Sequence, residues 1–355
     1  MATAAIGLRR LAQQRLAGQA FATPAAAVAW LGAVQAQDYP GALWSLGMRL
    51  HEGTTAGDIE RAFDAGTILR THVLRPTWHF VTPADIRWLL ALTAPRVLAA
   101  SAYSMRRAEL DDALCARSNA IIAAEVRGGH HRTRTELATA LEREGIAATG
   151  LRLTYLVMRA ELDAVICSGP RHGKQFTYAL LDERAPHTKT PGRDEALAEL
   201  TQRYFTGHGP ATVRDFVWWS GLTVADAKAG LALVGSALAH EERDGQTYWF
   251  AAAALPAADP AHAPLLLPTY DELLVGYSAF DATRRGERGA SAPQVFDPTI
   301  ILGGQVVGGW KRTLQRGSVV IERAPFAPLA PAADAAITAA ANRYGRFLGL
   351  PVVLA

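Results

Sequence analysis

The chain has 355 residues and a formal net charge of +3, and 50% of it is hydrophobic against 19% charged. An apolar fraction this large in a chain this long supports two or three domains and excludes global disorder. Its two cysteines, Cys115 and Cys167, are too few for a disulfide framework or a zinc site.

Neither export nor membrane insertion is indicated by the sequence. The N-terminal segment lacks the layout of a secretory signal, and the apolar runs are Ala-rich and broken by Arg or Gly. We therefore expect a soluble, cytoplasmic, monomeric protein that needs no membrane and no obligate protein partner.

The cationic side chains are almost all arginine. Only four lysines occur, at 174, 189, 228 and 311, which leaves 32 arginines. Arginine binds phosphate bidentately and stacks on bases. A GC-rich genome would produce the same bias, so composition alone leaves a nucleic-acid partner open.

Internal repetition is the main clue to organisation. Three stretches of roughly sixty residues share the order helix, helix, helix and two-stranded hairpin, which is typical of a winged helix. We predict a mainly α fold with short β-hairpins, built from three tandem winged-helix units and a C-terminal α+β region. The predicted boundaries are 1–114 for the first unit, 115–190 for the second, 191–255 for the third and 256–355 for the C-terminal β-hairpin and helix region.

The first unit is predicted to begin with a helix at Thr23-Pro24, where threonine can cap the helix and proline suits its first turn. Thr55 and Asp58 predict the start of another helix, which Gly66 ends. Paired strands are expected at 68–73 and 77–81 across the turn 74–76, and a connecting helix at 82–107.

The middle unit has the clearest pattern. Thr133 and Glu136 form a capping box, and a second helix is expected over 149–162 because its apolar residues recur at helical spacing. A strand at 164–167, a polar glycine-rich loop and a strand at 175–180 then predict a wing.

The third unit repeats these capping signals after a helix at 194–205. Thr212 with Asp215 and Thr223 with Asp226 predict two more helices, the second running to about residue 240. Asp244-Gly245 predicts a hairpin turn before a strand at 247–250. In the tail we expect a linker at 252–264, a mobile loop at 284–292, a hairpin within 299–307 that turns at Gly303-Gly304, and a helix at 332–348.

Familiar catalytic motifs are absent from the sequence. It contains no dinucleotide-binding G-x-G-x-x-G after a strand, no phosphate-binding G-K-[ST] loop, no G-x-S-x-G elbow and no H-E-x-x-H zinc pair. We therefore expect no cofactor and no metal.

Cationic side chains gather in four patches. Any one of them is best explained as a solvated face, but four on repeated winged-helix units favour binding to duplex DNA, whose phosphates such cations neutralise. The patches are Arg127, His130, His131, Arg132 and Arg134; Arg171, His172 and Lys174; Arg284, Arg285 and Arg288; and Lys311, Arg312 and Arg316.

Two aromatic pairs have alternative explanations. Trp78-His79, with His72 across the hairpin, could stack on a base in DNA, although a strand Trp is more often part of the core. Trp218-Trp219 is expected to belong to the core.

The segment Gln35-Ala36-Gln37 closes the first predicted helix and is followed by Asp38. Taken alone, two glutamines at a helix end would be solvated surface residues. Asp38 could supply negative charge or act as a base, but we expect it rather to cap a following turn.

These residues belong to a longer resemblance. The chain resembles the bacterial winged-helix DNA glycosylases of the AlkZ and YcaQ group over nearly its whole length, with the motifs in the same order. The matching segments are 34–38 (Val-Gln-Ala-Gln-Asp), 69–79 (Leu-Arg-Thr-His-Val-Leu-Arg-Pro-Thr-Trp-His), 209–212, 215–216 and 219–221, and 307–312 (Val-Gly-Gly-Trp-Lys-Arg).

The resemblance implies a function and a site. In that group a Gln-x-Gln element holds the catalytic water, which here would be Gln35 and Gln37. That form implies removal of bulky alkylpurines, sometimes of interstrand crosslinks, often as self-resistance in producers of DNA-alkylating antibiotics. Support is expected from Asp38, His72, Trp78 and His79, and DNA contacts from Arg75, Arg132, Arg134, Arg171, Lys174, Lys311 and Arg312.

The chemistry suits an amide pair. Glutamine is not a base, but an N7-alkylguanine or N3-alkyladenine already carries positive charge and leaves readily. The enzyme then needs mainly a positioned water and a suitable field. We therefore expect a monofunctional glycosylase without a covalent enzyme–DNA intermediate.

A shared water constrains the backbone. Residues two apart on an α-helix are turned by about 200°, whereas in extended chain they share a face. We therefore predict that the helix begun at Pro24 ends by Val34, that Ala36 faces inward, and that Pro40-Gly41 forms a turn.

Two other functions remain open. A winged-helix protein can be a non-catalytic DNA-binding or transcription-regulatory protein, or a scaffold or toxin-associated protein with degenerate sites. Placement of Gln35 and Gln37 on a basic concave surface would favour the enzyme.

Overall fold

The computed structural model describes residues 2–185, 191–253, 257–259, 263–278 and 297–355. Helices dominate it, and its sheets are short and mainly antiparallel, which confirms the predicted mainly α fold with short β-hairpins. No helix of this described part is both long and apolar enough to span a membrane. The predicted loop at 284–292, with the basic patch inside it, lies outside the described residues.

The N-terminal helices and hairpin follow the capping signals. Thr23 caps its helix through Ala26 N–H, and Thr55 and Asp58 form a capping box, as predicted. The predicted hairpin is present and gains a third strand, so that the sheet order is β1-β3-β2. The elements are α1 (Ala2–Gln13), α2 (Pro24–Leu31), β1 (Val34–Gln35), α3 (Tyr39–Gly47), α4 (Ala56–Asp64), β2 (Leu69–His72) and β3 (Trp78–Val81).

The predicted turn at Pro40-Gly41 is wrong, because these residues begin α3. Proline is tolerated there since the first helical turn has no internal acceptor for its missing N–H, and Ala42 N–H donates to the Asp38 carbonyl to close that turn. Helix α3 then packs Trp44 against Tyr344 and Phe347 near the C-terminus.

The middle segment contains the predicted helices and hairpin. Thr133 and Glu136 form the expected capping box, and three strands pair in the order β4-β6-β5. These residues have a core of their own. The elements are α5 (Ile86–Arg107), α6 (Asp112–Val126), β4 (Arg132–Thr133), α7 (Arg134–Arg143), α8 (Gly150–Leu162), β5 (Ile166–Ser168), β6 (Thr177–Leu180) and α9 (Leu181–Arg184).

The third segment departs from prediction at one helix end. Its second capped helix ends at Val234, not near residue 240. Gly235 ends it because its φ is positive, at 60°, and its N–H donates to the Leu231 carbonyl. His240 therefore lies in a strand, and Asp244-Gly245 turns the hairpin as expected. The elements are α10 (Arg193–His208), α11 (Val213–Ser220), α12 (Val224–Val234), η1 (Gly235–Ala237), β7 (Leu238–Arg243) and β8 (Gln246–Ala251).

The C-terminal segment forms a five-stranded sheet of order β13-β12-β11-β10-β9, larger than the predicted hairpin and helix. Gly303 and Gly304 turn the first hairpin as expected, but its second strand continues to Gln315 and pairs with another long strand. The elements are β9 (Leu265–Leu267), α13 (Glu272–Val275), β10 (Thr299–Leu302), β11 (Gln305–Gln315), β12 (Ser318–Pro325), α15 (Pro331–Leu348) and β13 (Val352–Leu354).

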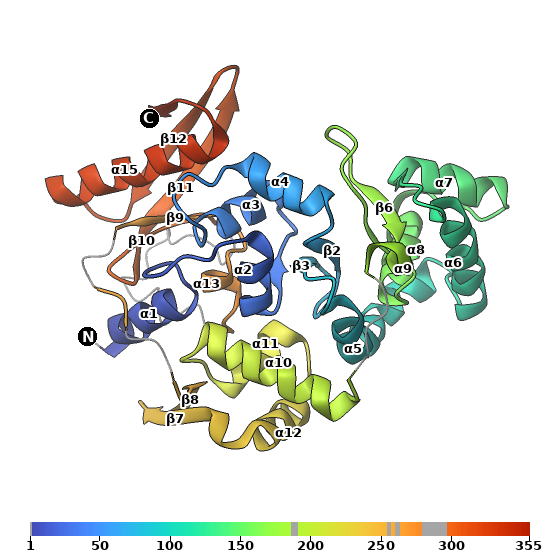
Figure 1. Ribbon diagram of the computed structural model, residues 1–355, viewed down its shortest axis with the longest axis horizontal. Helices are drawn as coiled ribbons and strands as arrows, with labels where there is room; N and C mark the ends of the chain where they lie inside the picture. The colour runs from blue at the N-terminus through green and yellow to red at the C-terminus, as the bar shows by residue number, and fades with distance from the viewer. Residues whose placement is uncertain (1, 186–190, 254–256, 260–262, 279–296) are drawn as a thin grey trace.

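The two ends of the chain share one core. Helices α2 to α4 occupy the middle of the molecule, with the C-terminal sheet and α15 on one side, α6 to α9 on the other and α10 to α12 below them (Figure 1). Leu31, Val34 and Trp44 pack in the same cluster as Leu266 and Trp310. The candidate site is therefore built from both ends of the sequence.

A buried ion pair joins these ends. Arg49 and Asp271 are both inaccessible to solvent, and Arg49 donates from Nη1 to Asp271 Oδ2 at 2.8 Å and from Nη2 to Oδ1 at 3.0 Å. Arg49 Nη2 also donates to Gln14 Oε1 at 2.7 Å. Asp271 in turn accepts from Leu273 N–H and so begins α13.

Replacing Arg49 by Leu should therefore destabilise the protein strongly. The change leaves the Asp271 carboxylate buried without its cation, which costs about 3–5 kcal/mol. The exposed pair between Arg346 and Glu52 is the matched control, since Arg346→Leu should cost less than about 1 kcal/mol. Denaturant unfolding measures both, and equal losses in the two variants would contradict the expectation.

Candidate active site

The Gln-x-Gln segment begins in a strand at the edge of the N-terminal sheet, where Gln35 ends β1, and it leaves the strand in a bend at Gln37. Helix α2 ends at Leu31, and Gln35 pairs with His79 in the antiparallel β1–β3 ladder. Ala36 is fully buried, whereas Gln35 is largely buried and Gln37 is exposed. The predicted helix end and the inward Ala36 are confirmed.

The hairpin β2–β3 holds both amide groups. Gln35 Oε1 accepts from Arg75 Nη2 at 2.7 Å, and Gln37 Oε1 accepts from Trp78 N–H at 3.3 Å. Between them, Ala36 N–H donates to the Trp78 carbonyl at 2.7 Å. A carbonyl oxygen has two lone pairs, so each amide oxygen keeps the capacity to accept one further hydrogen bond.

Arg75 connects this segment to the third part of the chain. It follows Leu74, which takes a positive φ of 64° at the turn of the hairpin. Besides Gln35, it donates from Nη1 to the carbonyls of Trp218 and Trp219 at 3.2 and 3.1 Å. Burial lowers its pKa, and the Glu272 carboxylate acts in the opposite direction. The predicted contact of Arg75 with DNA stays a prediction; within the protein its guanidinium donors bind Gln35 and the two Trp carbonyls.

A buried carboxylate lies directly behind Gln35. Glu272 Oε1 accepts from Gln35 N–H at 2.7 Å, and its Oε2 accepts from Trp219 Nε1 at 2.9 Å and lies 3.3 Å from His208 Nε2. Burial raises the pKa of Glu272, but the hydrogen bonds from His208 and Gln35 outweigh it and leave the pKa below its usual value. Glu272 is therefore a buried anion.

Sequence reasoning missed Glu272. Its partners are separated from it by up to 237 residues. The only local signal is an acidic pair before an apolar run, which predicts nothing more than a helix start.

The aromatic hairpin residues occupy two environments. His72 Nδ1 is hydrogen-bonded to Glu161 of α8, and its ring lies 4.3 Å from that of Trp78. Trp78 Nε1 donates to the same carboxylate at 3.4 Å. His79 is fully buried, with Nδ1 2.9 Å from the Thr77 carbonyl, and burial together with the Arg75 cation lowers its pKa to about 3. His79 is therefore neutral.

Asp38 takes a different role from the predicted one. It occupies the N-cap position of α3, but its side chain makes no capping hydrogen bond. Its carboxylate instead pairs with Arg312 of β11 at 3.3 Å, and Arg312 Nη1 donates to Tyr344 Oη at 2.7 Å. The expected side-chain cap is wrong, and Arg312 is used to hold the end of the Gln segment.

The remaining predicted DNA contacts divide into paired and free cations. Arg132 pairs with Glu125 at 3.4 Å, and Arg134 donates to Thr154 at 2.5 Å. Arg171 pairs with Glu60 of α4 at 2.9 Å. Lys174 and Lys311 are exposed.

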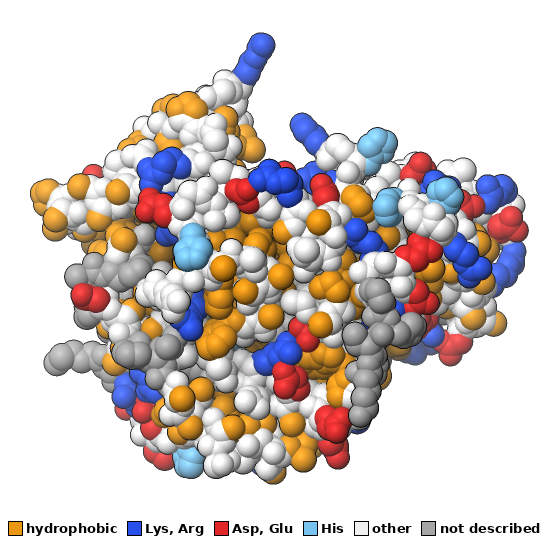
Figure 2. Space-filling view, in the orientation of Figure 1, with side chains coloured by type: hydrophobic (Ala, Val, Ile, Leu, Met, Phe, Trp, Pro, Cys, Tyr) orange, Lys and Arg blue, Asp and Glu red, His pale blue; other side chains and the backbone are white. Residues whose placement is uncertain are grey.

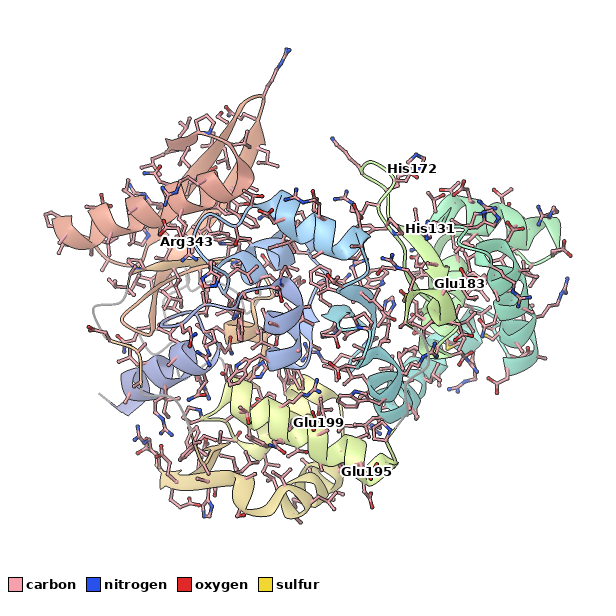
Figure 3. The ribbon with its side chains drawn as sticks, viewed as in Figure 1. His131, His172, Glu183, Glu195, Glu199 and Arg343 are labelled. Atoms are coloured by element: carbon pink, nitrogen blue, oxygen red, sulfur yellow. The ribbon has the colours of Figure 1, made fainter. Side chains whose placement is uncertain are left out.

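Two projections extend from the same edge of the molecule. One is the β5–β6 loop, which carries His172 at its tip, and the other is the β11–β12 hairpin (Figures 1 and 3). In Figure 2, Lys or Arg side chains lie at the tips of both projections. Lys174 is exposed in the first, and Arg316 is exposed between Gln315 and Ser318 in the second.

Metal ligation finds no support in this geometry. Across the described residues, no three His, Cys, Asp or Glu side chains come together in a way that could hold a metal ion.

Comparison with known proteins identifies the family. The sequence profile of the AlkZ-like DNA glycosylases matches residues 28–347. The chain belongs to the AlkZ-like DNA glycosylase family. Its fold is similar to that of the Streptomyces sahachiroi DNA glycosylase AlkZ, with a TM-score of 0.76 and 21% sequence identity over 99% of each chain. Comparison with curated protein sequences gave no match.

The neutral His79 of this AlkZ-like chain predicts a pH dependence. Below the ordinary His pKa of 6.5 the unfolded chain binds a proton that the folded chain excludes down to about pH 3, so stability falls as pH falls. The slope should be about 1.4 kcal/mol per pH unit.

Denaturant unfolding of His79→Asn and wild type from about pH 7 to about pH 5 tests this slope. The variant should lose it, whereas the exposed His172→Asn should keep it. Parallel curves for His79→Asn and wild type would show that His79 is not the responsible group.

Proposed function

We propose that this AlkZ-like glycosylase hydrolyses the N-glycosidic bond of bulky or cationic alkylated purines of the N7-alkylguanine type. Gln35 and Gln37 hold the attacking water. The observation that carries the proposal is the non-helical Gln-x-Gln segment, with both amide oxygens anchored on the β2–β3 hairpin and each keeping an acceptor site.

An amide pair suffices for a substrate that carries its own activation. A cationic base leaves without an acid, so the protein has to position the water and stabilise positive charge developing on the sugar. Amide oxygens do both through their dipoles, and they do not titrate. The buried Glu272 carboxylate adds negative charge behind Gln35, and the Arg75 cation offsets part of it.

The proposed enzyme is monofunctional. No lysine is among the hydrogen-bond partners of the Gln segment within the described chain, so a Schiff-base intermediate has no nucleophile there. Water is then the only attacking group, and the product is an abasic site.

Duplex DNA is the proposed partner, bound by a monomer. We interpret the middle segment as a winged helix with the β5–β6 loop as its wing, and the first and third segments as related units; the strand order β4-β6-β5 beside α6, α7 and α8 supports this interpretation. Lys174 on this wing and Arg316 on the β11–β12 hairpin lie on two arms at one edge, where they could contact the phosphates of one duplex.

The resemblance to the AlkZ and YcaQ group extends the proposal to the biological role of the enzyme. A cytoplasmic enzyme of this kind would remove bulky adducts and unhook interstrand crosslinks, as self-resistance in a cell that makes a DNA-alkylating antibiotic.

A non-catalytic DNA-binding protein is the second candidate. Its supporting observation is that Arg75, which anchors Gln35, would also stiffen the hairpin in a protein that only binds DNA. Loss of base excision without loss of DNA binding in Gln variants separates the two functions.

Gln35→Ala and Gln37→Ala should each lower excision of N7-methylguanine from duplex DNA at least about a hundredfold, because either loss frees the water. Affinity for DNA should stay within a few-fold. The double variant should be about as slow as either single variant, since the two amides act as one unit. Alkali-labile abasic sites measure the reaction.

Gln202→Ala, at an exposed position of α10, is the control and should retain full activity. Excision by both Gln-segment variants at the wild-type rate would exclude the water-holding role.

Lys174→Ala should weaken binding to all duplex sequences alike, because phosphate contacts carry no sequence information. The slope of log affinity against log salt should become shallower by about 0.9 for the one lost contact. Lys228→Ala is the control, since α12 lies at the opposite end of the molecule from the β5–β6 loop (Figure 1). An unchanged slope for Lys174→Ala would show that the loop does not touch DNA.

A further inference from the structure

The Trp218-Trp219 pair was expected to be core, and for Trp218 this is wrong. Trp219 is completely buried, whereas Trp218 is 43% exposed on α11. Exposing so much of the largest apolar side chain carries a cost in water. A function for Trp218 outside the core would explain why that cost is accepted.

The indole of Trp218 is held in place even though it is exposed. Its Nε1 donates at 3.1 Å to the carbonyl of Val275, the last residue of α13. Its own carbonyl accepts from Arg75 Nη1 at 3.2 Å. With the edge of the ring anchored and the polar atom satisfied, the exposed part is apolar ring surface, and the side chain has little freedom to lose on binding a ligand.

Trp218 lies within one side chain of the proposed water site. The Arg75 guanidinium carbon is 5.9 Å from the centre of the Trp218 ring, and the same guanidinium donates to Gln35 Oε1 at 2.7 Å. At 5.9 Å the cation–π attraction to Arg75 is at the limit of its range. The ring face of Trp218 therefore remains available to a ligand. A base or its adduct next to Gln35 would come within reach of the indole.

We infer that Trp218 is the stacking platform for the alkylated base and its apolar adduct. The inference rests on the proposed function, and it names the substrate class as cationic purines with an apolar, preferably aromatic, substituent. A ring face stacks on any base, and its negative quadrupole attracts an N7-alkylpurinium cation more than neutral guanine. Trp218 therefore selects the lesion, while Gln35 and Gln37 act on it.

The test compares two lesions in one duplex sequence, N7-methylguanine and N7-benzylguanine. Trp218→Ala should lower the ratio of single-turnover excision rates, benzyl over methyl, by about tenfold, the size expected for one lost base–aromatic stack. Trp218→Phe should restore most of that ratio because it keeps a smaller ring. Leu233→Ala, which removes another exposed apolar side chain from the same segment, should leave the ratio unchanged.

A binding measurement separates this inference from the proposed function. In the Gln37→Ala background, Trp218→Ala should lower the preference for benzyl-lesion duplex over unmodified duplex by about tenfold. If wild type excises neither lesion, the glycosylase proposal fails, and the binding preference still decides the role of Trp218. An unchanged benzyl-over-methyl excision ratio together with an unchanged binding preference would refute the platform.

Discussion

One buried carboxylate organises the whole centre of the molecule. Glu272 accepts hydrogen bonds from β1 through Gln35 N–H and from α11 through Trp219, and it contacts His208 of α10. An ion removed from water is tolerated only when every donor is in place. The backbone of Gln35 is therefore held by the C-terminal segment through Glu272 as well as by its own hairpin, and Trp219 of the third segment holds the same carboxylate.

In this site the charged carboxylate is separate from the groups proposed to hold the water. The groups proposed to face the water are neutral amides, while Glu272 is buried behind them and His79 stays neutral because burial lowers its pKa to about 3. A water held by amides does not change with pH, and a carboxylate out of contact with solvent cannot compete as a ligand or nucleophile. This division suits a substrate whose leaving group needs no proton.

The features that could be predicted from the sequence are those that depend on residues close together in the chain. The capping boxes at Thr55 and Thr133 and the glycine turn at 303–304 depend on local chemistry, and all formed as expected. Helix α3 was missed because its turn-like Pro40-Gly41 is overruled by packing of Trp44 on the C-terminal helix. Gln35 and Gln37 were found through a resemblance, whereas Glu272 has no pattern that could reveal its distant partners.

The β5–β6 loop shows that the role of a cationic side chain cannot be assigned from the sequence alone. Arg171 and Lys174 look equivalent as cations on one glycine-rich loop. Arg171 N–H donates to Asp64 and its guanidinium pairs with Glu60, which fixes the base of the loop on α4. Glu161 fixes the same unit again through His72 and Trp78. The middle segment is thus attached to the β2–β3 hairpin, which anchors Gln35 and Gln37. Lys174 lies in a loop whose base is fixed on α4. Any phosphate bound there would be set at a fixed position relative to the proposed water site.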